Sequence, residues 1–195
     1  MFQSGREFVD QMSRDLHQAG DPNPRNFANA GVLAASPISD DSLAAVGLVK
    51  VAPGDLWFEG DVDGTGTVSV VQYHLDTSTT NNCPCLRRSQ QPKITGNPVT
   101  GQTAPVYEVE VQNVQNTNIF TAYSQGLTGV PVTLPVDFNN DPAAISTIDT
   151  IQAVLTIQSN YTDPRTRKKP LTTLISTVRI NNCSQAAIGL PMSCK

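Results

Sequence analysis

Four cysteines are the residues whose type and spacing suggest chemistry most directly. Cys83 and Cys85 flank Pro84 in a polar segment, and Cys183 and Cys194 lie near the C-terminus. An even number of cysteines in loops is typical of disulfides formed in an oxidising compartment. We favour a Cys183–Cys194 bond, which closes a short local loop and leaves Cys83 and Cys85 to form a tight ring; cross-pairing of the two pairs stays open. A four-thiolate zinc site is a weaker hypothesis, because structural zinc pairs are usually spaced Cys-x2-Cys or longer.

The second chemical candidate is the acidic, glycine-rich segment Asp61-Val62-Asp63-Gly64-Thr65-Gly66. Oxygen-bearing side chains at Asp61, Asp63 and Thr65 match the start of an EF-hand calcium loop. The twelfth position of such a loop would be Gln72, which lacks the required bidentate carboxylate. We therefore interpret the segment as a tight turn that needs Asp and Gly. We predict no cofactor, with calcium at this segment as the weaker alternative.

The sequence contains no recognisable catalytic motif. Its two histidines, His17 and His74, have no motif neighbours, and it lacks a Gly-x-Ser-x-Gly elbow, a phosphate-binding loop and a His-Glu-x-x-His motif. We predict no catalytic residues and no enzymatic activity.

The charge pattern argues against nucleic acid as a partner. The net charge is −4, and only 15% of the residues are charged. The one basic run is formed by Arg165, Arg167, Lys168 and Lys169. We interpret this run as a solvated loop and expect no nucleic-acid partner, because the chain as a whole is acidic.

The first 20 residues predict an amphipathic helix. Phe8, Met12 and Leu16 recur at helical spacing and form one apolar stripe. Gly20 and Pro22 end the helix. We expect the three apolar side chains to pack on a sheet.

The rest of the chain predicts strands and loops. Residues 21–45, 76–104 and 124–147 are rich in Pro, Gly and polar residues and are expected to be irregular, with at most one short strand near 86–88. Alternating apolar residues predict strands, and the last two form a long hairpin with a polar, basic connection. The predicted strands cover residues 46–51, 56–59, 67–75, 106–114, 116–123, 148–158 and 171–180.

Four segments of the chain resemble a known family. Residues 12–22, MSRDLHQAGDP, resemble the end of the pilin helix in minor pilins of the PilW type and in type II secretion pseudopilins of the GspJ type. Residues 61–76 resemble the hairpin that follows in these proteins, and Leu86-Arg87-Arg88 resembles the Leu-x-Arg motif that comes after it. Residues 176–182 resemble their last strand. The segments occur in the family's order along most of the chain.

The resemblance implies a fold and a role. The expected fold class is α+β, pilin-like and loop-rich, with the N-terminal helix on antiparallel sheet. Residues 1–195 would form one domain, with 1–20 as the C-terminal half of the pilin helix and 21–195 as the β-rich body. An apolar half-helix upstream of Phe2 would anchor the protein in the inner membrane, with the globular domain on the periplasmic side. The protein would then join other minor pilins or pseudopilins at or near the tip of an extracellular filament.

Two alternatives from other classes stay open. One is a secreted β-rich binding module, an adhesin or a carbohydrate-binding domain. The other is a hydrolase whose catalytic residues form no sequence motif and come together only in the folded chain. A cleavable signal peptide upstream of Phe2 would favour the binding module, whereas an apolar segment of about 20 residues would favour the pilin.

Overall fold

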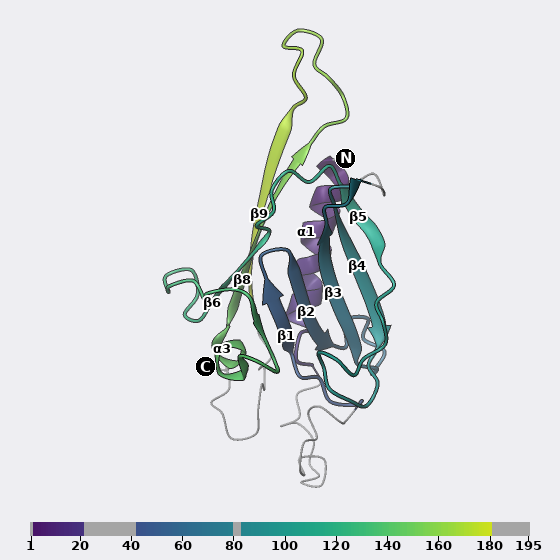
Figure 1. The fold of residues 1–195 in the computed structure, drawn as a ribbon, viewed down its shortest axis with the longest axis vertical. Coiled ribbons are helices and arrows are strands. Elements are labelled where there is room, and N and C mark those ends of the chain that lie inside the picture. Colours follow the sequence, from purple (N-terminus) through teal and green to yellow (C-terminus); the bar gives the residue numbers. More distant parts are fainter. Residues whose placement is uncertain (1, 22–41, 80–82, 181–195) are drawn as a thin grey trace.

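Two antiparallel β-sheets make up most of the protein in the computed structural model, which describes residues 2–21, 42–79 and 83–180 (Figure 1). The larger sheet has the strand order β5-β4-β3-β2-β1-β7, and the smaller sheet has the order β6-β8-β9. Most of the stretch 21–45, as well as Cys183 and Cys194, lies outside the described residues. The elements are α1 (Phe2–His17), β1 (Leu48–Ala52), β2 (Asp55–Gly60), β3 (Ser69–Asp76), β4 (Cys85–Pro92), β5 (Glu108–Gln112), β6 (Phe120–Tyr123), β7 (Val136–Asp137), α3 (Pro142–Thr147), β8 (Thr150–Gln158) and β9 (Leu171–Arg179).

The predicted loop-rich α+β, pilin-like fold class is wrong for this chain. The described residues form a mainly β structure of nine strands, to which α1 adds the one long helix. The largest local difference is β4, eight residues long and paired with β3 in unbroken register, where the sequence predicted a loop with one short strand. Its sequence, CLRRSQQP, is too polar to show an alternating apolar pattern. Arg88 and Gln90 lie on the same face of the sheet as Tyr73, so polar residues occupy positions where a strand usually carries apolar ones.

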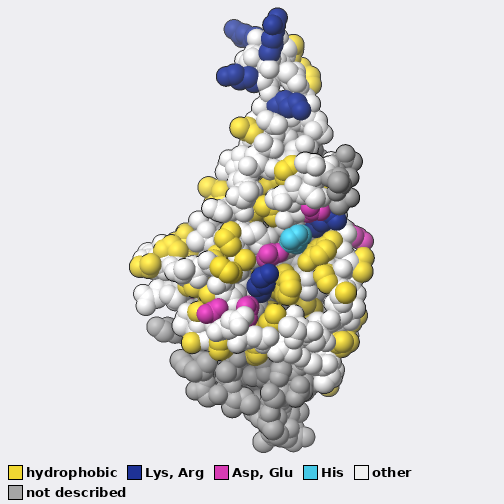
Figure 2. Space-filling view, in the orientation of Figure 1, with side chains coloured by type: hydrophobic (Ala, Val, Ile, Leu, Met, Phe, Trp, Pro, Cys, Tyr) yellow, Lys and Arg dark blue, Asp and Glu magenta, His cyan; other side chains and the backbone are white. Residues whose placement is uncertain are grey.

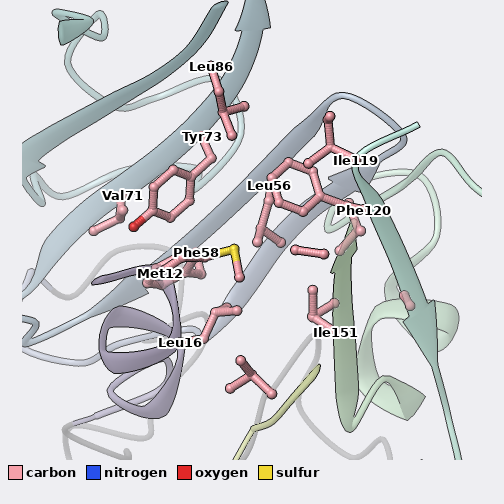
Figure 3. Close-up of a cluster of buried hydrophobic side chains, with 14 of the residues drawn as sticks. Met12, Leu16, Leu56, Phe58, Val71, Tyr73, Leu86, Ile119, Phe120 and Ile151 are labelled. Atoms are coloured by element: carbon pink, nitrogen blue, oxygen red, sulfur yellow. The ribbon is translucent and has the colours of Figure 1, made fainter. Parts of the chain in front are cut away.

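α1 packs between the two sheets. It contacts β5 of the larger sheet and β8 and β9 of the smaller one. Figure 3 shows Met12 and Leu16 pointing from α1 toward Leu56, Phe58 and other buried side chains of the sheets. The helix therefore contributes its apolar stripe to one continuous core, which is how an amphipathic helix gains most of its stability.

Strands β8 and β9 form the predicted long hairpin, and this prediction is confirmed. The two strands pair along their whole length, from Thr150 opposite Arg179 to Gln158 opposite Leu171. Alternation explains the pairing, because Ile151, Ala153 and Leu155 are buried while the residues between them are partly exposed. Figure 1 shows the connection between the two strands projecting well beyond the rest of the molecule.

Candidate functional site

The apolar stripe of α1 is fully buried in the core between the two sheets. Phe8, Met12 and Leu16 are at most 2% exposed. The ring of Phe8 meets the ring of Tyr73 on β3 edge-on, with 5.4 Å between the ring centroids. The opposite face of α1 is polar and exposed, and it includes Gln3, Arg6, Glu7, Asp10, Arg14 and His17. The helix thus holds the core with one face and presents charged side chains to the outside with the other.

Asp15 joins the helix to two strands at once. Its Oδ2 accepts a hydrogen bond of 2.6 Å from the hydroxyl of Tyr73 on β3. The same oxygen accepts a 3.0 Å bond from Nε of Arg88 on β4 and lies 2.9 Å from a terminal guanidinium nitrogen. Arg88 also donates to the side-chain oxygen of Gln90 at 2.7 Å. Because both partners of the ion pair are nearly buried, this carboxylate–guanidinium contact is a specific one and not a surface pair.

The charge states of Tyr73 and Arg88 at this junction of α1 with the larger sheet are set by their surroundings. Burial raises the pKa of Tyr73 well above its usual value, and the negative charge of Asp15 raises it further. Burial acts to lower the pKa of Arg88, but Tyr73 and Asp15 outweigh it, so that the pKa of Arg88 is raised. Tyr73 therefore stays a neutral donor, and Arg88 stays a cation that neutralises Asp15.

The chain leaves α1 directly onto the end of β2. The amide of Gly20 donates to the carbonyl of Glu59, and the amide of Asp61 donates to the carbonyl of Asp21, both at 2.8 Å. Gly60 is required at this contact, since a Cβ there would collide with the backbone carbonyl of Gln18. The helix end is thus joined to the sheet by main-chain bonds as well as by Asp15.

A buried ion pair lies on the same strand end. The carboxylate of Glu59 lies 2.8 Å from Nζ of Lys93, and both side chains are completely buried. Lys93 also donates to the carbonyl of Ala44, and the amide of Val46 donates to Glu59 Oε2. Burial raises the pKa of Glu59, although Lys93 acts in the opposite direction. A buried pair of this kind ties the segment before β1 to the sheet but is not a ligand site.

The oxygens of the candidate calcium loop are engaged within the loop. Asp61 accepts hydrogen bonds from the amides of Thr65 and Gly66. Asp63 accepts from the hydroxyl and the amide of Thr65, and these bonds hold the pKa of Asp63 below its usual value. Gly64 and Gly66 both have positive φ, as a tight turn requires. Asp61, Asp63 and Thr65 therefore act as turn residues in this structure, and calcium binding stays an untested prediction.

Cys83 and Cys85 are bonded to each other across Pro84. Asp76 lies close to both sulfurs, so the three residues together have the spacing of a metal site. Two features argue against that use: the disulfide removes both thiolates, and Arg87 forms a 3.0 Å ion pair with Asp76. The favoured Cys183–Cys194 bond lies outside the described residues.

His74 and Asp55 form a pair that the sequence analysis did not identify. Nδ1 of His74 lies 2.6 Å from Asp55 Oδ1, and Asp55 also contacts Lys50 at 3.4 Å. The ring of His74 lies 5.4 Å from that of Tyr107. An acid–histidine pair supplies two parts of a nucleophilic triad. Within the described part of the chain, no serine, threonine or cysteine side chain is hydrogen-bonded to this imidazole.

An open groove of about 520 Å³ lies beside the helix–sheet junction. Its walls are polar and include Arg88, Gln90, Glu108 and Glu110. Burial raises the pKa of Glu110. The lining has one cation, Arg88, and three carboxylates, Asp63, Glu108 and Glu110. Such a charged, open surface suits contact with a polar partner better than enclosure of a small apolar ligand.

Comparison of the chain with protein-family models, curated proteins and solved structures finds no significant match. Among the described residues, no helix is both long and apolar enough to cross a membrane.

The structure brings together residues from three of the four segments that resemble the pilin family. Asp15, Tyr73 and Arg88 come from separate segments and meet in one hydrogen-bonded cluster. Asp15 was not singled out from the sequence, although a signal was present. It stands three residues after Met12 and seven after Phe8, so helical spacing places a carboxylate inside the apolar stripe.

Proposed function

We propose that the protein is a non-enzymatic assembly subunit, a minor pilin or pseudopilin that acts at or near the tip of a type IV pilus or a type II secretion pseudopilus. The observation that carries the proposal is the Asp15–Tyr73–Arg88 cluster. Three of the segments that resemble the pilin family contact one another in this cluster, and the cluster fastens α1 to the sheet. Segments scattered over the surface would instead have suggested a coincidental resemblance. A filament subunit needs this fastening, because force on the helix must reach the globular body.

The exposed face of α1 supports a role in contacts between subunits. It carries two acidic and two basic side chains, Glu7, Asp10, Arg6 and Arg14, and these reach solvent. Mixed charges at fixed helical spacing favour one orientation of a neighbouring helix over others. The proposal also requires an apolar helical segment upstream of Phe2, which would anchor the subunit in the inner membrane before assembly.

Charge reversal on this face tests the proposal. We expect Asp10→Arg in the full-length protein to reduce surface filaments or secretion, while the domain keeps its unfolding temperature because Asp10 is exposed. Asp141→Arg is the matched control, since Asp141 is exposed and precedes α3, whose main contacts are with β7 and β1. Equal phenotypes for the two variants would contradict an assembly role of the helix face. A cleaved signal peptide in place of the apolar segment would favour the secreted binding module.

A further inference from the structure

The connection between β8 and β9 is an ordered, cationic projection. We call residues 159–170 the hairpin tip. Its backbone is closed by hydrogen bonds from the amide of Asp163 to the carbonyl of Lys168 and from the amide of Arg167 to the carbonyl of Asp163. Arg167 has a φ of +54°, a conformation that a non-glycine residue holds only where its surroundings fix it. The tip therefore has a defined backbone turn from which its cationic side chains extend.

The charges of the hairpin tip are available to a partner. Arg165, Arg167, Lys168 and Lys169 are all exposed, and none of them forms an ion pair within the described part of the chain. The one acidic residue of the tip, Asp163, uses its two carboxylate oxygens for the amide of Arg165 and the hydroxyl of Thr166. Figure 2 shows the Lys and Arg side chains gathered at the end of the projection. A local positive charge is thus held away from the body of an acidic protein.

The hairpin tip lies at the same end of the molecule as the start of α1. Figure 1 shows the N-terminus near this end, with the tip reaching farther along the long axis. Gly5 in the first turns of α1 lies against Ile157 and Leu174 near the base of the projection. A chain segment that continued α1 upstream would therefore run in the direction of the tip.

From these observations we infer that the hairpin tip binds the anionic phospholipid surface of the membrane in which the subunit waits before assembly. The inference rests on the proposed function, which places a membrane anchor upstream of α1. Four exposed cations on a projection of fixed shape match the charge of such a surface. The ring of Tyr161, 64% exposed at the base of the tip, is a side chain suited to the headgroup region. The tip would thus fix how the globular body stands on the membrane.

The test is vesicle flotation of the purified chain at low ionic strength. We expect binding to vesicles that contain about 30% phosphatidylglycerol and none to pure phosphatidylcholine, since surface attraction needs anionic lipid. Raising the salt to about 0.15 M should weaken the binding, because the contact is electrostatic. The variant Arg165→Gln/Lys169→Gln should need roughly 30-fold more lipid for half-maximal binding, about fivefold for each cation removed.

The control variant Arg14→Gln/Arg179→Gln changes the net charge equally at exposed positions outside the tip. It should change the half-maximal lipid concentration by less than about threefold. Both double variants should keep the unfolding temperature of the parent, because none of the four side chains is buried. Absence of binding to anionic vesicles, or an equal loss in the two variants, would overturn the inference.

A duplex DNA of equal phosphate concentration is the competing ligand. Tip-dependent binding to DNA that exceeds binding to the vesicles would overturn the lipid assignment and identify a nucleic-acid contact instead. The vesicle assay uses the chain alone, so its failure leaves the filament role standing. A deletion strain with normal filaments would remove the filament role without changing the vesicle result.

Discussion

At the scale of single residues, Asp15 shows how one charged side chain positions a helix. Its carboxylate satisfies Tyr73 and Arg88 together, and these come from neighbouring strands. Nearly buried pairs of this kind contribute little net stability compared with apolar residues, but breaking them is costly. Asp15 therefore fixes where α1 lies on the sheet.

We expect Asp15→Asn to lower the free energy of unfolding by about 3 kcal/mol, because the amide leaves the nearly buried Arg88 guanidinium without an anion. Chemical denaturation of the parent and the variant measures the difference. Asp10→Asn, on the exposed face of the same helix, is the control and should change stability by less than about 0.5 kcal/mol. Equal effects would mean that the Asp15 contacts do not hold the helix.

Leu16 tests the apolar side of the same contact. Its side chain is fully buried, so Leu16→Asp places an unpaired charge in the core and should cost several kcal/mol, on the order of 4 kcal/mol or more. Thermal unfolding is the measurement. An unchanged unfolding temperature would show that α1 does not pack as the structure has it.

The Glu59–Lys93 pair leads to a prediction about pH. The pKa of Glu59 is raised above 4.5 in the folded protein, so the folded state binds this proton more tightly than the unfolded state does. The contribution of Glu59 to stability should therefore fall as the pH rises from about 4.5 through the raised pKa. Denaturation at several pH values should show this fall in the parent and its absence in Glu59→Gln. A contribution that rises over the same range would contradict the burial argument.

At the scale of elements, the docking of the end of α1 on β2 depends on a close backbone approach. A Cβ at Gly60 would lie within 3 Å of the main chain of Gln18. We expect Gly60→Ala to cost about 2 kcal/mol, because backbone atoms must move to admit the methyl group. Gly54→Ala is the control, since a Cβ there meets its neighbours at an ordinary 3.4 Å or more. Denaturation curves that coincide for the two variants would argue against this docking.

Elements with a strong apolar period were predictable from the sequence, whereas β4 was not. The apolar stripe of α1 predicts a helix, and the alternating apolar residues of β8 predict a strand, because each element buries one face. β4 gave no such signal, because Arg88 and Gln90 face the polar junction with Asp15. Its pairing with β3 is a tertiary property that local sequence does not encode.

The candidate site was predictable only in part, for the same reason. Turn chemistry explains the Asp61–Gly66 loop from its sequence. The Asp15–Tyr73–Arg88 and Asp55–His74 contacts join residues far apart in the chain. The one sequence signal was the position of Asp15 within the apolar stripe of the helix, which indicated a buried partner for its carboxylate.

At the scale of the whole molecule, charge and core occupy different regions. The core joins α1 to both sheets, while the hairpin tip holds four cations apart from it. One face of α1 and the tip are therefore free to contact other surfaces without disturbing the fold. An assembly subunit needs binding surfaces that are separate from the residues that stabilise its fold.

Complementation of a deletion strain tests the filament role most directly. The strain lacking the gene is supplied with the full-length protein, with its Asp10→Arg variant or with residues 1–195 alone, and surface filaments and secreted substrate are quantified. We predict a clear loss in the deletion strain, which the full-length protein restores, and which neither the Asp10→Arg variant nor residues 1–195 alone restores. Normal filaments and secretion in the deletion strain, or full rescue by residues 1–195 alone, would contradict the proposed function.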